Sequence, residues 1–492
     1  VQNTNDFSTV SKVSTAATGY FTDEFQKYFV SRTSRRSPLI HRGYCVRSQA
    51  VNHCIKEFLQ DTKDSAHRQV LSLGCGFDSL YFRMSSNLSD DYKLLGVDLG
   101  DIPALDSALD SAGLRCDCPT LVLAEVVLCY VDPARSTSVI GWAAQRFPHS
   151  RFIIYEQFSP SDPFGQVMMN HFVSLNSALR SVAAYPQLED QERRFLQQGW
   201  EQCRILDMNE FSALCVSDME KSRIESLEPF DEFEELHLKC SHYFILAASR
   251  GILADCSALR PICDLHTGMD ELYNDDFDFC SISGICIEQS RPYPPWSGKQ
   301  YVFVFGGRAV PSAALHEEGV FLQVDELRWV QVGVTGTAPP QCHSHSSSGW
   351  NGAAVISGGL LESGVPTGSV FILHPLQTHF EWEKLETNPP LTPRYAHTSH
   401  VIGDKLLLVG GVWIHRRGVP GLAVVDLKTG QVSEFELDTA SLEWPLMLHG
   451  HSSVLLQNSK QVVILGGGGT CFSFGTHLNA QPVVVDLSFV LC

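Results

Sequence analysis

The chain has 492 residues, which is too long for one ordinary domain, and its 44% hydrophobic content is enough to build sizeable cores. Only 18% of the residues are charged, which excludes wholesale disorder. The formal net charge is −19 and no basic run is longer than that at 34–36, which argues against a broad nucleic-acid-binding face but leaves room for a locally basic pocket.

The first residues are polar, and no stretch reaches the roughly 18 apolar residues that a membrane-spanning helix needs. We therefore expect a soluble protein of the cytoplasm. The sixteen cysteines include no C-x-x-C pair, and the closest spacing, Cys116-Asp117-Cys118, is poor for zinc. We expect free thiols and no metal site.

The first half of the chain alternates short apolar runs with amphipathic stretches. A helix is expected first, because Val51, Cys54, Ile55, Phe58 and Leu59 share one helical face. Strands are expected where apolar runs end in glycines or in an acid, at 70–73, 94–97, 121–124 and 151–155, and a last strand at 243–248. Strands that alternate with helices predict an α/β domain with a parallel sheet covered on both faces.

The second half has a different rhythm, in which apolar strands end in a diglycine. The diglycines begin at Gly306, Gly358, Gly410 and Gly466, so their spacings are 52, 52 and 56 residues. A tryptophan recurs between them, and a histidine precedes each later strand (His345, His397 and His451). Repeats of this length with a diglycine resemble Kelch repeats, each of which forms one blade of a β-propeller.

The organisation predicted from these patterns is an α/β Rossmann-like domain over 1–250 and an all-β propeller over 296–492. Residues 251–295 are rich in cysteine and aspartate and fit neither half, so we interpret them as a linker or a degenerate blade.

A glycine turn, Gly74-Cys75-Gly76, follows the first apolar run, and glycines there let the backbone approach a ligand closely. Asp98, Glu125 and Glu156 follow later runs, at the carboxyl ends of strands where open α/β sheets bind ligands. Ser79 stands where a dinucleotide-binding loop would have its third glycine, which favours S-adenosylmethionine over a dinucleotide. The alternative is a tight turn without a ligand.

Two arginines lie five residues apart in the segment His41 to Arg47, before an amphipathic helix. Arg42 and Arg47 are suited to hold carboxylates in bidentate fashion, although charged surface is the alternative interpretation.

These segments together resemble the leucine carboxyl methyltransferase family, and the likeness covers nearly all of residues 1–250. The motifs that match are PLIHRGYCVR at 38–47, LSLGCGFDS at 71–79, PTLVLAEVVL at 119–128, YEQ at 155–157, FGQ at 164–166 and RIESLE at 223–228. Fused to Kelch repeats, the chain is similar to the tRNA-modifying branch of that family, which completes wybutosine in phenylalanine tRNA.

The resemblance implies S-adenosylmethionine as methyl donor, with carbon dioxide as co-substrate of a second, methoxycarbonylating step on the amine. By matching position, the cofactor contacts would be Lys12, Arg47, Gly74, Asp98, Leu99 and Glu125. Arg47, Tyr130 and Tyr155 are our candidates for orienting the substrate, with packing as the alternative for the two tyrosines. A carboxylate is already a nucleophile, so the reaction needs positioning groups instead of a catalytic triad.

The sequence departs from the family after the glycine turn, where a strand ending in the ribose-binding aspartate is expected. Asp98 matches the family's later, adenine-side segment by motif, but by spacing it lies where a ribose-binding acid would. Either a strand and helix are deleted, or Asp98 has taken the ribose role; we favour deletion because the sequence through Glu125 stays in register. The four repeats also make a short propeller.

Two other functions remain open. One is methylation of a protein's C-terminal leucine carboxylate, for which a propeller is unnecessary. The other is a non-catalytic Kelch interaction protein with a disabled methyltransferase domain, which the apparent deletion motivates.

Overall fold

The structure is a computed structural model. It describes residues 2–84, 92–262, 283–287, 301–309, 313–314, 320–323, 326, 328–330, 332–376, 379–414, 421–470 and 475–488. The chain divides into two compact units, Val1–Gly268 with Cys471–Gly475, and Met269–Thr470 with Thr476–Cys492. Among the described residues, no helix is long and apolar enough to cross a membrane.

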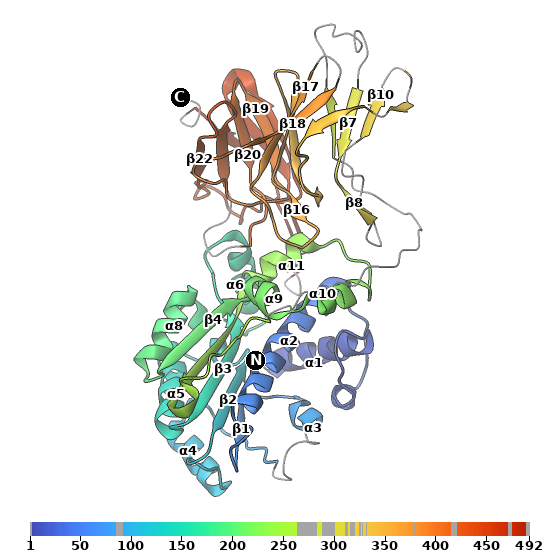
Figure 1. Cartoon of the computed structure of the whole chain (residues 1–492). Coiled ribbons are helices and arrows are strands. Elements are labelled where there is room, and N and C mark those ends of the chain that lie inside the picture. The colour runs from blue at the N-terminus through green and yellow to red at the C-terminus, as the bar shows by residue number, and fades with distance from the viewer. Residues whose placement is uncertain are drawn as a thin grey trace. The chain divides into compact units, whose positions relative to one another are not determined.

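The first unit is built on a five-stranded sheet with the order β1-β2-β3-β5-β4 (Figure 1). The strands are β1 (Gln69–Leu73), β2 (Thr120–Glu125), β3 (Ser150–Gln157), β4 (Gln202–Asp207) and β5 (Tyr243–Arg250). β1, β2 and β3 run parallel, whereas β5 is antiparallel to both β3 and β4. The expected α/β sheet is confirmed, with its last strand reversed.

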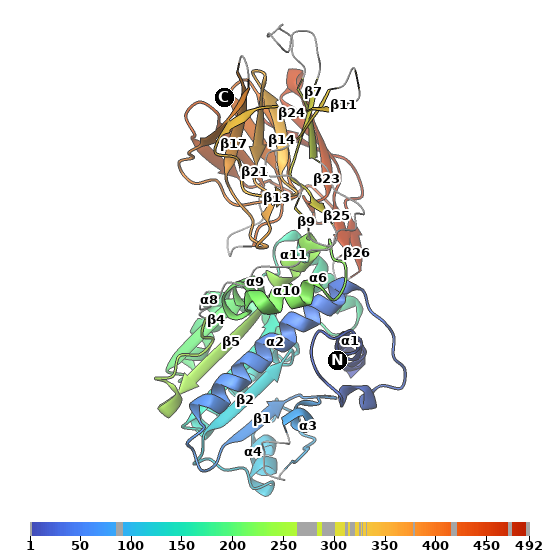
Figure 2. The same ribbon diagram turned by 45° about the vertical axis from the view of Figure 1, so that its right-hand side comes forward.

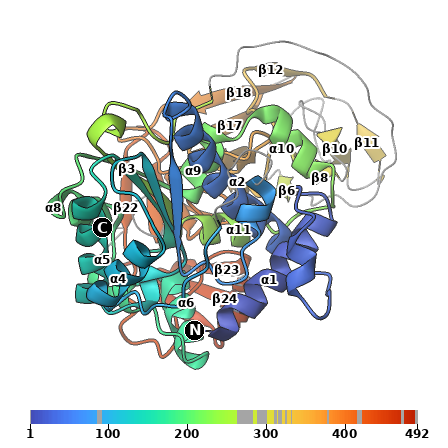
Figure 3. The same cartoon turned by 90° about the horizontal axis from the view of Figure 1, so that it is seen from below.

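Helices cover both faces of this sheet, with α4, α5 and α8 on one side and α1, α2 and α9 on the other (Figure 3). The helices are α1 (Gln2–Ala17), α2 (Pro38–Asp61), α3 (Leu80–Met84), α4 (Ile102–Ser111), α5 (Pro133–Arg146), α6 (Pro163–Ser174), α7 (Arg180–Ala184), α8 (Leu188–Gln197), α9 (Met208–Cys215), α10 (Asp218–Glu225) and α11 (Phe233–Cys240). The short 3-10 helices are η1 (Gln26–Phe29), η3 (Leu128–Tyr130), η4 (Gly251–Leu253) and η5 (Gln457–Ser459).

The sequence explains where these helices begin and which face they bury. α5 starts at Pro133, which has no N–H to leave unpaired, and the Asp132 carboxylate accepts from the N–H groups of Ala134 and Arg135. Its Ile140 packs into a core with Phe152 of β3. The expected helical face of α2 is confirmed: Val51, Cys54, Ile55 and Phe58 are buried and Leu59 is half-buried.

The expected strand at 94–97 is wrong. Residues 92–98 have no regular structure, and the side chains of Leu94 and Leu95 are exposed. β1 is therefore the edge of the sheet: it pairs with β2 on one side, and no described strand pairs with its other side. An apolar run becomes a strand where its side chains pack against a covered face, and Leu94 and Leu95 have no such cover.

The second unit places the four diglycine repeats in four sheets (Figure 2). Their orders are β11-β10-β7-β6, β12-β18-β17-β15-β14, β19-β20-β21-β22 and β23-β24-β27. The bounds are β6 (Ser283–Ile287), β7 (Tyr301–Phe305), β10 (Val320–Gln323), β11 (Arg328–Val330), β12 (Val334–Gly336), β14 (Ser346–Trp350), β15 (Ala353–Ser357), β17 (Val370–Pro375), β18 (Phe380–Leu385), β19 (Thr398–Ile402), β20 (Lys405–Val409), β21 (Leu422–Asp426), β22 (Val432–Phe435), β23 (His451–Leu456), β24 (Gln461–Gly466) and β27 (Val483–Asp486).

Three further pairs are two-stranded: β8 (Arg308–Ala309) with β9 (Ala313–Ala314), β13 (Cys342–His343) with β16 (Leu360–Leu361), and β25 (Gly468–Thr470) with β26 (Thr476–Leu478).

The recurring diglycine of one repeat contacts the recurring histidine of the next repeat. Gly358 has φ +63°, and a Cβ there would lie 2.6 Å from Cε1 of His397, in the next repeat. Gly306 has φ +68°, and its Cβ would lie 2.9 Å from Cε1 of His345. Only glycine fits beside these rings in this backbone conformation. The Kelch-type expectation is thereby explained in physical terms.

Candidate functional site

Two cations and a carboxylate meet at the carboxyl edge of the sheet. Glu125, the last residue of β2, lies 3.1 Å from Nζ of Lys12 on α1 and 2.5 Å from Nε of Arg47 on α2. Burial opposes ionisation of Glu125, but the charges of Arg47 and Lys12 outweigh it and lower the pKa of Glu125 to about 2. The structure thus brings together three residues that the resemblance assigned to one cofactor.

The glycine turn lies beside this cluster. Leu73 pairs with Ala124 in the sheet, so Gly74 follows β1 at the level where Glu125 ends β2. Gly74 has φ +56°, and a Cβ there would lie 2.6 Å from Cγ1 of Val127. A backbone this close to the loop after β2 needs glycine.

Tyr155 of β3 joins the site through Arg47. The guanidinium carbon of Arg47 lies 5.5 Å from the ring centroids of both Tyr155 and Tyr44. Burial raises the pKa of Tyr155 well above its usual range, so its hydroxyl stays protonated and can donate a hydrogen bond. Tyr130, in η3, instead packs near Phe172 of α6, with ring centroids 6.1 Å apart.

Asp98 and Leu99 lie in the turn before α4. The exposed Asp98 carboxylate accepts from the Gly100 N–H at 2.9 Å, and Leu99 packs partly against the core. Within the described ranges, neither residue forms a hydrogen bond or ion pair with Glu125 or Arg47. The part of the chain that the structure describes has no second strand ending in an acid beside β1.

Glu156 has a structural role that its position in sequence did not reveal. Its side chain is buried, and Oε1 accepts from the backbone N–H groups of Cys129 at 2.8 Å and Val127 at 3.3 Å. Burial raises the pKa of Glu156 to about 7 despite these donors. Glu156 therefore shapes the loop that follows Glu125, and it faces backbone instead of a ligand.

Arg42 does not share the carboxylate-binding position of Arg47. It is buried, with its guanidinium carbon 4.1 Å from the ring centroid of Phe230. Its neighbour His41 belongs to a second network: Nδ1 lies 2.6 Å from Glu228, and Nε2 lies 2.8 Å from Oγ of Ser14. This network joins α1, α2 and the segment after α10, and so brings the motifs at 41–47 and 223–228 into contact.

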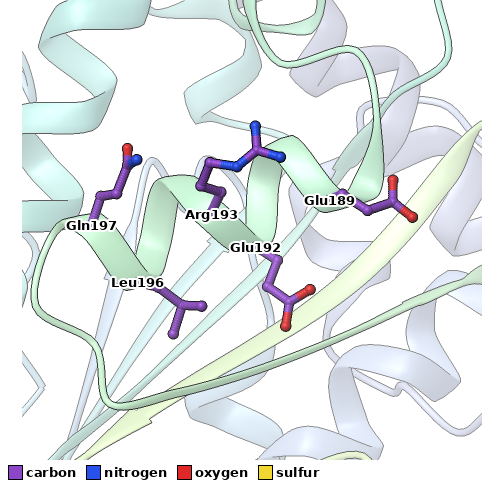
Figure 4. A pocket seen from close by; sticks show the side chains of 5 residues that line it. All are labelled: Glu189, Glu192, Arg193, Leu196 and Gln197. Carbon is purple, nitrogen blue, oxygen red and sulfur yellow. The ribbon is translucent and has the colours of Figure 1, made fainter.

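Sequence reasoning missed Lys239 of α11 and Tyr243 of β5, both buried near Arg47. The sequence contains one indication of these two residues: they lie at or just before the start of the last predicted strand. In the fold, that strand begins at the same edge of the sheet as Glu125. A surface hollow on α8 is unrelated to this edge, since Figure 4 shows it lined by side chains of that helix alone (Glu189, Glu192, Arg193, Leu196 and Gln197).

An open α/β sheet with a glycine turn after its first strand, and a charged cluster at its carboxyl edge, is the architecture of S-adenosylmethionine-dependent methyltransferases. The profile of the leucine carboxyl methyltransferase family matches residues 5–98. That of the KLHDC2/KLHL20/DRC7 Kelch-repeats domain matches residues 296–483. The chain is therefore a methyltransferase followed by Kelch repeats.

Its relatives are more specific. The chain is 37% identical to tRNA wybutosine-synthesizing protein 4 of Rattus norvegicus, over 99% of this chain and 97% of that protein. It is 36% identical to the Homo sapiens protein of the same name, over 99% and 97%. It is also 36% identical to a leucine carboxyl methyltransferase 1 homolog of Arabidopsis thaliana, over 53% of this chain and 93% of that one. The chain belongs to the tRNA wybutosine-synthesizing protein 4 family.

The alignment also shows that the chain is shorter than its rat relative. It spans 670 positions against 492 residues here, while both sequences are covered almost throughout. The rat relative therefore has internal residues that this chain lacks.

Proposed function

We propose that the chain completes wybutosine in phenylalanine tRNA. In this proposal it methylates the α-carboxylate of the modified guanosine side chain and then methoxycarbonylates the amine with carbon dioxide, in the cytoplasm. The cluster of Lys12, Arg47 and Glu125 beside the glycine turn is the observation that carries the proposal, because a carboxylate with two cations suits the charged amino-acid end of S-adenosylmethionine. We propose the domain bounds 1–250 and 296–492, with 251–295 as linker or degenerate blade.

The residues present fit one half of the cofactor better than the other. Lys12, Arg47, Glu125 and Gly74 would hold its amino-acid half, and the cofactor when bound supplies an electrophilic methyl group. Asp98 and Leu99 would contact the nucleoside half only if that turn moves toward the edge, since the Asp98 carboxylate is exposed. We infer that affinity comes mainly from the amino-acid half.

The chain's own residues would then orient the acceptor. Tyr155, protonated and close to Arg47, can donate to an acceptor oxygen, and Tyr130, in the 3-10 helix after β2, would help to orient the substrate. Alignment and exclusion of water are sufficient for a carboxylate nucleophile, and no general base is needed for the esterification.

Calorimetric titration of the full chain with S-adenosylmethionine tests the cofactor assignment. We expect binding by the wild type, a loss of at least tenfold in affinity for Arg47→Ala, and no change for Arg193→Ala, a matched arginine on the exposed face of α8. Absence of binding at millimolar ligand would contradict the proposal and favour the non-catalytic Kelch interaction protein, which is motivated by the lack, among the described residues, of an acidic strand beside β1.

Mass spectrometry of phenylalanine tRNA nucleosides tests the substrate. Cells without this protein should accumulate the carboxyl free acid, and the wild-type gene should restore wybutosine where Arg47→Ala does not. Methylation of a protein's C-terminal leucine with unchanged wybutosine would support the alternative acceptor.

A further inference from the structure

Three tyrosine rings and two cations form a cage at the carboxyl edge of the sheet. The rings of Tyr155 and Tyr243 lie 5.6 Å apart, centroid to centroid. Nζ of Lys239 lies 5.3 Å from the ring of Tyr243 and 5.8 Å from that of Tyr44. Because Arg47 also lies over Tyr44, that ring is shared by the two cations. We call these five residues the tyrosine cage.

The cage adjoins the cofactor cluster through the register of the sheet. Glu125 pairs with Tyr155 across β2 and β3, and Gln157 pairs with Tyr243 across β3 and β5. The antiparallel direction of β5 places its first residue at the edge where β2 and β3 end. Lys239 enters from the last turn of α11, which directly precedes β5.

Two basic side chains, Arg47 and Lys239, lie over the same Tyr44 ring, and this arrangement favours binding of an anion. The side chain of Lys239 is buried, and burial lowers its pKa well below the usual range; the Cys240 thiol opposes this shift and the Arg47 charge adds to it. Arg47 is engaged by Glu125 at 2.5 Å. An incoming carboxylate would favour the ammonium form of Lys239 and would gain a charge-assisted hydrogen bond where the local dielectric is low.

We propose that Lys239 binds the carboxylate of the methyl acceptor within the tyrosine cage. This inference rests on the proposed function and deepens it, because it names the group that recognises the acceptor's charge. Transfer forms the O–CH3 bond and breaks the S–CH3 bond, so carboxylate and sulfonium become a neutral ester and a neutral thioether, and no proton moves. The ester has lost the charge that Lys239 recognises, which assists its release.

The test compares Lys239→Met, Lys239→Arg and the matched control Lys221→Met, whose lysine is on the surface of α10 beside Asp218. The substrate is phenylalanine tRNA from cells that lack the protein, which carries the free acid. Loss of a hydrogen bond to a charged group predicts that kcat/KM for this tRNA falls roughly 10- to 100-fold in Lys239→Met, mostly through KM. Lys239→Arg should recover part of the loss, Lys221→Met should match the wild type, and S-adenosylmethionine affinity should stay within about twofold throughout.

The wild type provides a second test that needs no variant. It should bind tRNA that carries the acid about tenfold or more tightly than tRNA that carries the methyl ester, since only the acid presents an anion. Equal affinities, or an unchanged KM in Lys239→Met, would overturn the inference alone. A wild type that binds S-adenosylmethionine but does not methylate the acid would overturn the proposed function, and this inference with it.

Discussion

Replacing Glu156 by Gln should remove a pH dependence from the stability of the methyltransferase unit. Burial raises the pKa of Glu156 to about 7, against an ordinary value of 4.5 for an exposed glutamate. Folding therefore favours the protonated form, and this contribution is fully present below pH 4.5 and is lost as the pH rises through 7. A difference of about 2.5 pH units corresponds to about 3 kcal/mol at alkaline pH. Gln keeps an oxygen that can accept from the Cys129 N–H at 2.8 Å, and it has no charge to bury.

The assay is urea unfolding of both proteins at pH 5 and pH 8. Hydrogen-exchange mass spectrometry of peptides from 120–157 monitors the unfolding, so that the signal comes from the methyltransferase unit. Relative to the wild type, Glu156→Gln should gain roughly 2 to 3 kcal/mol between pH 5 and pH 8. Glu234, whose pKa burial also raises to about 7, is present in both proteins and cancels. Equal slopes of stability against pH in the two proteins would refute the reasoning.

Three further outcomes follow from other contacts. Gly74→Ala should abolish calorimetric binding of S-adenosylmethionine and lower the free energy of unfolding by about 1–2 kcal/mol, because φ is +56° and the new Cβ would meet Val127; unchanged binding would contradict the assigned turn. Glu228→Ala should cost about 1–3 kcal/mol in urea unfolding, since it removes a partner of the buried His41, and a neutral result would show that the network is dispensable. The propeller should lose stability as the pH falls, because buried histidines with a lowered pKa resist protonation in the folded state. The expected loss is about 2 kcal/mol at pH 5 for each histidine whose pKa burial lowers to about 4. A free energy of unfolding for 332–470 that does not change between pH 8 and pH 5 would contradict this. Those histidines are His345, His449 and His451.

The sequence predicted the centre of the α/β sheet better than its margin. The runs at 121–124 and 151–155 become fully buried strands because each has neighbours on both sides. The run at 94–97 looks equivalent in composition, yet it forms no strand, and the side chains of Leu94 and Leu95 are exposed. Apolar composition therefore predicts the capacity to form a strand, and the available partner decides whether one forms.

The sequence predicted those site residues that belong to a recognisable motif. Arg47 and Glu125, assigned to one cofactor from resemblance, do meet at 2.5 Å. Glu156 looked equivalent to Glu125 because it also ends a strand, but its neighbours are backbone N–H groups that only the folded loop supplies. Lys239 was not predictable from its own segment, since its surroundings arise when α11 packs against α2.

The unpaired edge of β1 affects which part of a competitive inhibitor determines its affinity for this chain. In the described ranges, the nucleoside half of a methyl donor would meet no strand-end acid beside β1, while its amino-acid half would meet Lys12, Arg47 and Glu125. Competitors altered at the ribose should then bind this chain almost as well as unaltered ones. Competitors without the amino-acid carboxylate should lose most of their affinity, so this chain would select its ligands by their zwitterionic end.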